Sequence, residues 1–308
     1  MNQIVNFVLK VILSRNFILV FAVIMGMIFG DYATYIKEYT IFILGLTMVF
    51  ATTGIDSKAL LPIKKLFKPM LVGTFLNYFV FGAVVLVLAW FLMPTTELFM
   101  GFVVIVAAPP GVAVIPFSGI LKGDIEYSII GVFGAFLASI VIAPVLVQFF
   151  TDGAGVSSWS LFMLMIKLVL IPLILSRFLL YKPLFKYVAK VRGKMVDWGF
   201  AIIIFTAVGM NRNVFFSDPK ILILSSIVLL AGTFAIGSLY EFFSKKVGIS
   251  YERSITQVLL LTIKSSGFSV VTAMTLFGKE AAIPSAILAV IVLAYLLFLS
   301  IRLEFKKK

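Results

Sequence analysis

The sequence predicts an all-α polytopic membrane protein with ten transmembrane helices. The first observation is composition: 62% of the 308 residues are hydrophobic and only 13% are charged, about half the charged share of a soluble domain. The second is that the apolar residues form ten stretches, several close to the roughly 20 residues that a spanning helix needs. The third is that basic residues gather in alternate connecting segments, as they do in multi-pass membrane proteins.

The expected spans follow one another with short connections. The first five are 17–30, 39–54, 69–93, 98–121 and 127–150, and the second five are 159–176, 196–210, 221–240, 254–277 and 281–301. Ahead of them, residues 1–14 have the apolar spacing of a short helix that lies in the membrane interface. The spans divide into a first five-helix repeat, residues 1–153, and a second one, residues 154–308.

The charge distribution predicts that both termini are cytoplasmic. With ten spans, 20 of the 26 Lys and Arg residues fall on the side of the termini, and this excess marks the cytoplasmic side of the cell inner membrane. The net charge of +13 is therefore a topology signal. The basic residues do not form one face with interleaved aromatic residues, so we expect the lipid bilayer and no nucleic acid as a partner.

Two expected spans carry helix-breaking residues at equivalent positions of the two halves. These residues are Pro109, Pro110 and Gly111 in the fourth span and Ser265, Ser266 and Gly267 in the ninth. Because five is an odd number, the halves must have opposite orientations in the membrane. A proline kink alone would explain either break, but paired interrupted helices in inverted halves point to the binding site of a transporter.

Lys264 precedes the second break directly and lies near the middle of its span. A central lysine costs about 2.5–3.5 kcal/mol on membrane-insertion scales, so intramembrane charges suggest function. No carboxylate is expected at the same depth. The partners of Lys264 should therefore be carbonyl oxygens of a half-helix, water in a cavity or a bound anion. Asn77 in the third span either lines the same site or joins two helices by hydrogen bonding.

The absence of Cys and His excludes thiol nucleophiles, histidine bases and the histidine pair of zinc proteases. An intramembrane aspartyl protease needs two adjacent carboxylates at membrane depth, and none are expected. We therefore expect no enzymatic activity, no catalytic residue, no cofactor and no bound metal.

Four stretches resemble the bile acid–sodium symporter family. They are LGLTMVFATTGID in the second span, AAPPGVAVIPFSGILKGD across the fourth, MIKLVLIPLIL in the sixth and TIKSSG in the ninth. The resemblance implies a core domain of spans 3–5 and 8–10 and a panel domain of spans 1, 2, 6 and 7, with broken helices 4 and 9 crossing. It also implies that a small organic anion binds between these domains near the crossover and is moved by alternating access.

The chain departs from this family at the positions that the resemblance assigns to sodium binding. These positions carry Val114, Ile115, Leu260 and Lys264, whereas a hard cation needs several oxygen ligands. One lysine has the same formal charge as one glutamate with two sodium ions. We hypothesise that Lys264 replaces the sodium ions, so that transport is sodium-independent. The lysine then either exchanges protons during transport or stays charged in a carrier that works by facilitated diffusion.

Three alternative functions stay open. The first is a sodium-coupled organic-anion symporter. The second is an anion transporter like the auxin efflux carriers, although their typical Asn-Pro pattern is missing at the first break. The third is a receptor or scaffold without transport, which would not explain two matched breaks.

Overall fold

The computed structural model describes residues 15–55, 65–151, 158–212 and 218–305, and within these ranges the regular elements are helices without any β-strand. Among the described residues, seven helices are long and apolar enough to cross a membrane, and three shorter apolar helices lie at Phe17–Ile28, Thr96–Ala107 and Ser266–Phe277. The chain is thus an all-helical, multi-pass membrane protein. The interfacial helix expected at residues 1–14 lies outside the described residues.

The bounds of the helices follow the chain in two halves. The first half contains α2 (Arg15–Ile28), η1 (Gly30–Tyr32), α3 (Ala33–Ile36), η2 (Lys37–Tyr39), α4 (Thr40–Thr52), α5 (Phe67–Thr74), η5 (Phe75–Val80), α6 (Phe81–Leu92), α7 (Thr96–Ala107), α8 (Val114–Ile120) and α9 (Ile125–Thr151). The second half contains α10 (Ser158–Met165), η6 (Ile166–Leu170), α11 (Ile171–Leu179), α12 (Lys182–Met210), α14 (Pro219–Leu230), η7 (Ala231–Ala235), α15 (Ile236–Lys246), α16 (Tyr251–Thr262), α17 (Ser266–Phe277), η8 (Glu280–Ala282) and α18 (Ile283–Phe305).

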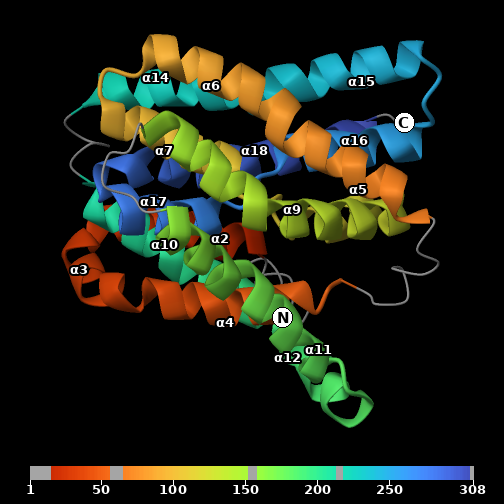
Figure 1. Ribbon diagram of the computed structural model, residues 1–308, viewed down its shortest axis with the longest axis horizontal. Helices are drawn as coiled ribbons and strands as arrows, with labels where there is room; N and C mark the ends of the chain where they lie inside the picture. The colour runs from red at the N-terminus through yellow and green to blue at the C-terminus, as the bar shows by residue number, and fades with distance from the viewer. Residues whose placement is uncertain (1–14, 56–64, 152–157, 213–217, 306–308) are drawn as a thin grey trace, which may run out of the picture.

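The seventh expected span differs most from the structure. The sequence predicts that it begins at residue 196, but α12 begins at Lys182. A proline in the first turn suits a helix start, and the lysines that follow are good helix formers. Hydropathy assigns these charged residues to a loop because it measures polarity and not helix propensity. The hairpin of α11 and α12 protrudes from the rest of the bundle as a result (Figure 1).

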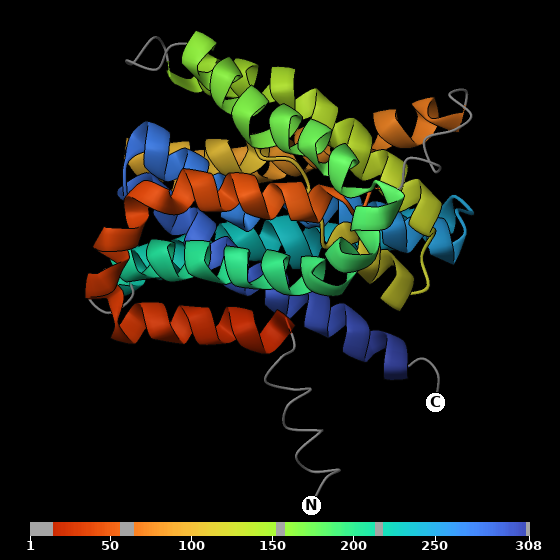
Figure 2. The same ribbon diagram turned by 90° about the horizontal axis from the view of Figure 1, so that it is seen from below.

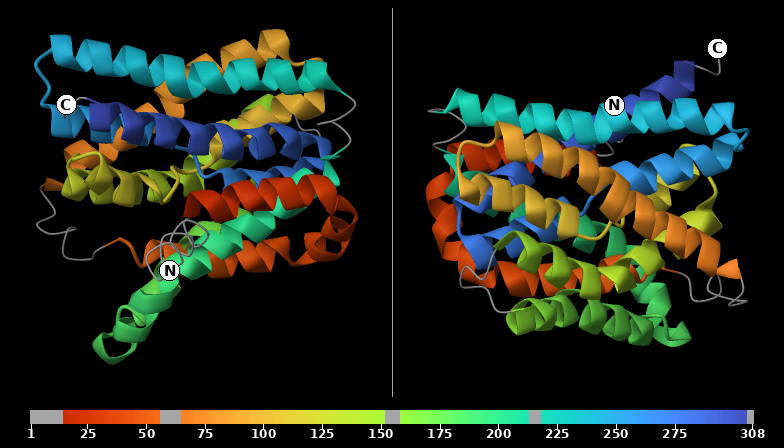
Figure 3. Two further views of the ribbon diagram at one scale, coloured as in Figure 1. Left: turned by 180° about the vertical axis from the view of Figure 1, so that it is seen from behind. Right: turned by 45° about the horizontal axis from the view of Figure 1, so that its top comes forward.

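Three of the long helices contain a π-helical segment. The segment η5 joins α5 to α6, η6 joins α10 to α11, and η7 joins α14 to α15. Figure 3 shows α14 and α15 as one long helix at the edge of the bundle. A π turn adds one residue between hydrogen-bonded partners, and the N–H of Phe81 accordingly donates to the carbonyl of Leu76.

The interrupted helices lie at the centre of the bundle. Every residue is buried from Leu98 to Ala107 in α7 and from Ser254 to Thr262 in α16, as expected for helices surrounded on all sides. The long helix α9 packs against α5, α7 and α16. On another side, α12 lies between α2 and α4, and Figure 2 shows these three helices side by side.

The helices α5 and α9 meet at two glycines. A Cβ atom added to Gly73 would lie 3.0 Å from the Cα atom and from the carbonyl oxygen of Gly131. The two backbones therefore touch at a point where no side chain fits, which is a common way for membrane helices to pack.

Gly73→Leu should lower the Tm of the purified protein, because overpacking of this kind costs about 1–3 kcal/mol. Gly45→Leu is the matched control, since Gly45 also lies in a helix but nothing lies within 4 Å of a Cβ added to it. Thermal unfolding of both variants in the same detergent measures the difference. Equal losses of Tm in the two variants would contradict the close approach of α5 and α9.

Candidate functional site

The two interrupted helices cross at their breaks. The helix α7 ends at Ala107 and α8 begins at Val114, whereas α16 ends at Thr262 and α17 begins at Ser266. Between these ends the two segments run antiparallel and are joined at Pro110 and Lys264. Backbone polar groups at membrane depth need partners inside the protein, and each break supplies them to the other.

Two backbone hydrogen bonds make this crossover. The N–H of Gly111 donates to the carbonyl of Ile263 at 2.8 Å, and the N–H of Ser265 donates to the carbonyl of Pro109 at 3.0 Å. Pro109, Pro110 and Gly111 thus lie in the first break, where the sequence places them. The second break ends two residues earlier than expected, because Ser265 is the N-cap of α17 and Ser266 with Gly267 already form its first turn.

The ammonium group of Lys264 is enclosed by carbonyl oxygens. The side chain is 1% exposed, and its Nζ donates to Oδ1 of Asn77 at 2.6 Å, to the backbone O of Asn77 at 3.2 Å and to the backbone O of Val106 at 2.9 Å. An ammonium has three donors, so its hydrogen-bonding capacity is filled within the protein. One partner, the carbonyl of Val106, belongs to the half-helix α7, as one of the three sequence-based alternatives stated. The other two oxygens belong to Asn77 in the continuous helix of α5, η5 and α6.

The local sequence explains why these oxygens are available. In a regular helix the carbonyl of Val106 would accept from the backbone nitrogen of Pro110, but proline has no N–H. The carbonyl of Asn77 would accept from the N–H of Phe81, which in η5 donates to Leu76 instead. Lys264 therefore donates to two carbonyls, those of Val106 and Asn77, that lack their regular helical donor because of a proline and a π turn.

Two aromatic rings and a further hydrogen bond of the Asn77 amide group complete the surroundings of the ammonium. Its Nζ lies 4.7 Å from the ring centroid of Tyr78 and 5.3 Å from that of Phe81, within the range of cation–π attraction. Nδ2 of Asn77 donates to the carbonyl of Leu260 at 3.0 Å. Asn77 thereby connects η5 both to Lys264 and to the end of α16.

Three of the four positions that the resemblance assigns to sodium binding, all except Lys264, are apolar and largely buried. Val114 and Leu260 are 0% exposed, and Ile115 packs partly buried against the core. Among the described residues no group of three or more His, Cys, Asp or Glu is placed to hold a metal ion. The charge at the crossover is therefore that of Lys264.

A small cavity lies on the other side of the crossover. Its volume is about 40 Å³, and it is lined by both breaks together with Leu19 of α2, Phe200 and Ile204 of α12 and residues of α18. Ser265 lines it, and the Ser265 hydroxyl is buried and has no hydrogen-bond partner among the described residues. The first N–H groups of α17, starting at Ser266, have no partner within their helix. Unpaired donors of this kind at a helix N-terminus are chemically suited to an anion.

A larger cleft adjoins this cavity at Val112. It measures about 440 Å³ and lies between α4 and α12 on one side and α8 and the start of α9 on the other. Its lining is largely apolar but includes one charge of each sign, Arg192 and Asp197. Arg192 donates to the carbonyl of Thr53 at 3.4 Å. The cavity therefore offers hydrogen-bond donors, and the adjoining cleft offers a largely apolar volume.

Five other polar residues of the expected spans lie away from the crossover. Each of Thr47, Thr52, Thr53 and Asn211 donates to a backbone carbonyl three or four residues earlier. Lys167 in η6 is exposed. None of these side chains joins the crossover.

Sequence reasoning missed three partners of Lys264. Val106 contributes only its backbone oxygen. Its position four residues before Pro110 could have identified that oxygen as an acceptor without a helical donor. Tyr78 and Phe81 contribute aromatic rings. Their positions one and four residues after Asn77 could have indicated that they lie near it on the same helix.

Known proteins resemble this chain in sequence. Residues 40–218 match the family model described as "Sodium Bile acid symporter family". The chain is 26% identical over 198 residues to the "Probable sodium/metabolite cotransporter BASS1, chloroplastic" of Arabidopsis thaliana, a match that covers 62% of this chain and 48% of the relative. It is 26% identical over 279 residues to the "Uncharacterized sodium-dependent transporter YocS" of Bacillus subtilis (strain 168), covering 89% of this chain and 85% of the relative. The chain thus spans about half the length of the Arabidopsis protein and most of the Bacillus one.

Lys264→Met should lower Tm, because buried acceptors left without a donor cost about 1–3 kcal/mol. Lys167→Met is the control and should leave Tm close to that of the unmodified protein, since its side chain is exposed. The double variant Lys264→Met/Asn77→Leu should lose less stability than the sum of the two single variants, by roughly 0.5–3 kcal/mol. Additive losses in thermal unfolding would contradict a direct interaction between Lys264 and Asn77.

Proposed function

Because the chain belongs to the sodium bile acid symporter family, we propose that it is a secondary transporter that moves a small organic anion by alternating access without sodium. The observation that carries this proposal is the buried Lys264 ammonium with its three oxygen partners at the crossing of two broken helices. A covalently attached cation there would do the electrostatic work of bound sodium ions.

The apolar surroundings of the crossover favour the lysine over a sodium ion. Sodium binding needs several oxygen ligands around one point, and the three oxygens nearest the charge are already bonded to Lys264. Val114 and Leu260 offer no side-chain oxygen. The proposed cycle therefore needs no sodium, and protons or simple facilitated diffusion are its two possible modes.

The cavity beside Ser265 supports an anionic substrate. A volume of about 40 Å³ exceeds the roughly 10–15 Å³ that one water needs, and it suits a carboxylate group better than a whole organic molecule. The carboxylate would accept from the Ser265 hydroxyl and from the N–H groups at the start of α17. The body of the substrate would occupy the adjoining cleft next to Val112.

We also propose that ten spans form two inverted repeats, 1–153 and 154–308, in the cell inner membrane with both termini cytoplasmic. The matched interruptions after α7 and after α16 support this arrangement, as do the π segments η5 and η7 in the third and eighth spans. In this architecture the panel would comprise spans 1, 2, 6 and 7, and the core would comprise spans 3–5 and 8–10. Substrate would bind between the two.

A sodium-coupled symporter is the second candidate, because the names of both relatives refer to sodium. The two candidates differ in what stabilises the protein. Purified protein should be stabilised by one of a panel of organic anions to the same extent with sodium and with potassium. Lys264→Gln should abolish this stabilisation, whereas Lys167→Gln should retain it.

Uptake into proteoliposomes extends the test to transport. With the anion found by thermal stabilisation, uptake should proceed at equal rates in sodium and in choline buffers. Sodium-stimulated uptake that survives Lys264→Ala would contradict the replacement of sodium by lysine and would favour the symporter.

Ser265→Ala should weaken anion binding by about tenfold or more, because a hydrogen bond to a charged group contributes about 1.5–3 kcal/mol. Ser285→Ala is the matched control, since the Ser285 hydroxyl is also buried without a partner among the described residues but does not line the cavity. Titration of the anion against thermal stability measures both. Equal affinities in the two variants would place the anion elsewhere.

A further inference from the structure

A second cleft of about 410 Å³ lies at one end of the bundle, where α5, α9 and α16 begin. In Figure 1 this is the right-hand end of the molecule. Three basic side chains line the cleft, those of Lys65, Lys68 and Arg253, together with the carboxylates of Asp124 and Glu126. It is separate from the crossover and takes no part in the proposed transport site.

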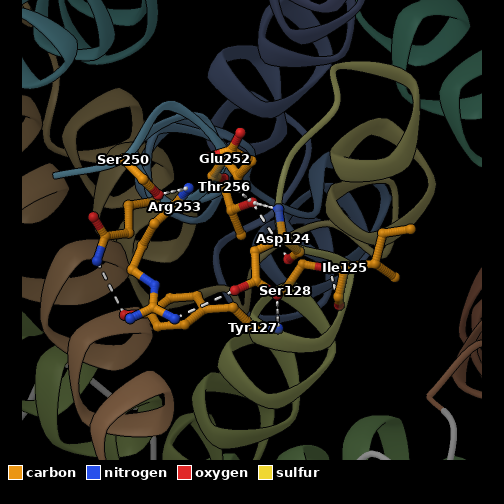
Figure 4. A network of polar contacts seen from close by, with 9 residues as sticks. Asp124, Ile125, Tyr127, Ser128, Ser250, Glu252, Arg253 and Thr256 are labelled. Atoms are coloured by element: carbon orange, nitrogen blue, oxygen red, sulfur yellow. Dashed lines mark hydrogen bonds and ion pairs between the residues drawn. The ribbon is translucent and has the colours of Figure 1, made fainter.

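Both carboxylate oxygens of Asp124 are bonded within the protein, as Figure 4 shows. One carboxylate oxygen accepts from the N–H of Tyr127 at 2.9 Å and starts α9, while the other lies 3.4 Å from Nη2 of Arg253. The N–H of Asp124 donates to the hydroxyl of Thr256 at 2.9 Å. Asp124 therefore connects the start of α9 to α16 and holds the guanidinium of Arg253 in place.

Arg253 keeps donors for a further partner. Its guanidinium lies 5.0 Å from the ring centroid of Tyr127, and its side chain remains 46% exposed. A guanidinium has five N–H donors, and the described contacts of Arg253 in the cleft use one of them. The ring and the carboxylate thus fix its position and leave its remaining donors available to an anion.

The two lysines have no ion-pair partner among the described residues. Lys65 and Lys68 line the cleft together with Arg253, whereas Glu126 is the one carboxylate of the lining that is not bonded to Arg253 or to a helix start. The cleft therefore has a positive excess that a phosphate anion would neutralise.

The cleft is continuous with a surface that faces hydrocarbon. Lys68, Leu71 and Phe75 follow one another at spacings of three and four residues and so share one face of α5 and η5. Leu71 is 66% exposed and Phe75 is 57% exposed. A ligand with a charged head and apolar tails fits this sequence of surfaces, because the head would lie among the basic groups and the tails along α5.

We propose that this cleft binds the phosphodiester headgroup of an anionic phospholipid, with Lys65, Lys68 and Arg253 as its donors. Basic pockets between membrane helices bind anionic headgroups in this way. The membrane supplies the ligand at high local concentration, which distinguishes a lipid from a soluble phosphate of the same chemistry.

The test titrates phosphatidylglycerol against the thermal stability of the purified full chain, with phosphatidylcholine as the uncharged comparison. Lys65→Gln/Lys68→Gln should raise the concentration of phosphatidylglycerol needed for half of the stabilisation by roughly 30-fold, because each lysine near an anionic surface contributes about fivefold. Native mass spectrometry should show one tightly bound phosphatidylglycerol fewer per chain in this variant.

Lys245→Gln/Lys246→Gln is the matched control. It removes the same charge from exposed lysines in the last turn of α15 and should leave the response to phosphatidylglycerol unchanged. If the control variant needed an equally raised concentration of phosphatidylglycerol, the effect would come from the overall charge of the protein, and the proposed site would be overturned. An unchanged response in Lys65→Gln/Lys68→Gln would also overturn it. Full stabilisation by inorganic phosphate alone would overturn the lipid in favour of a soluble phosphate.

Discussion

The hydrogen bonds of one buried ammonium allow two helices to be broken at the centre of this bundle. Each break exposes backbone groups where no solvent reaches, and such groups must find partners inside the protein. Gly111 and Ser265 satisfy part of this need through the antiparallel bridge. Lys264 adds a donor for the carbonyl of Val106 at the end of α7 and one for the carbonyl of Asn77 in η5. The positions of η5, α7, α16 and α17 relative to one another therefore depend on this side chain.

Extended backbone at the crossover separates two chemical tasks. Consecutive side chains of an extended segment point to opposite sides. Ile263 has extended backbone angles, and Lys264 next to it forms the antiparallel bridge with Pro110. The side chain of Lys264 consequently contacts η5, whereas Ser265 lines the cavity towards α2 and α12. The ammonium of Lys264 is thus bonded to η5 and α7, while the residues of the same break line the cavity.

The sequence predicted the parts of this structure that follow from local chemistry. Pro109 and Pro110 interrupt a helix wherever they occur, and the polarity of Lys264 is visible in any apolar stretch. The sequence offered Asn77 as a candidate for the same site but could not pair it with Lys264, because the two residues lie 187 positions apart. Val106 could not be found at all, because it contributes a backbone atom that every residue has. The early start of α12 at Lys182 was missed because its charged first turns project beyond the apolar stretch. The end of the second break was displaced because Ser266 and Gly267 are tolerated in a first helical turn.

The covalent attachment of the Lys264 cation has an electrical consequence. A diffusible counter-ion crosses with the solute and cancels its charge, but a tethered one returns to its starting position when the carrier resets. If the proposed cycle runs without a coupled proton, each turnover with a monovalent anion moves one net negative charge. A membrane potential of 100 mV, negative inside, then favours outward movement by about 2.3 kcal/mol. Such a carrier would be electrogenic and would work more readily as an exporter than as an importer.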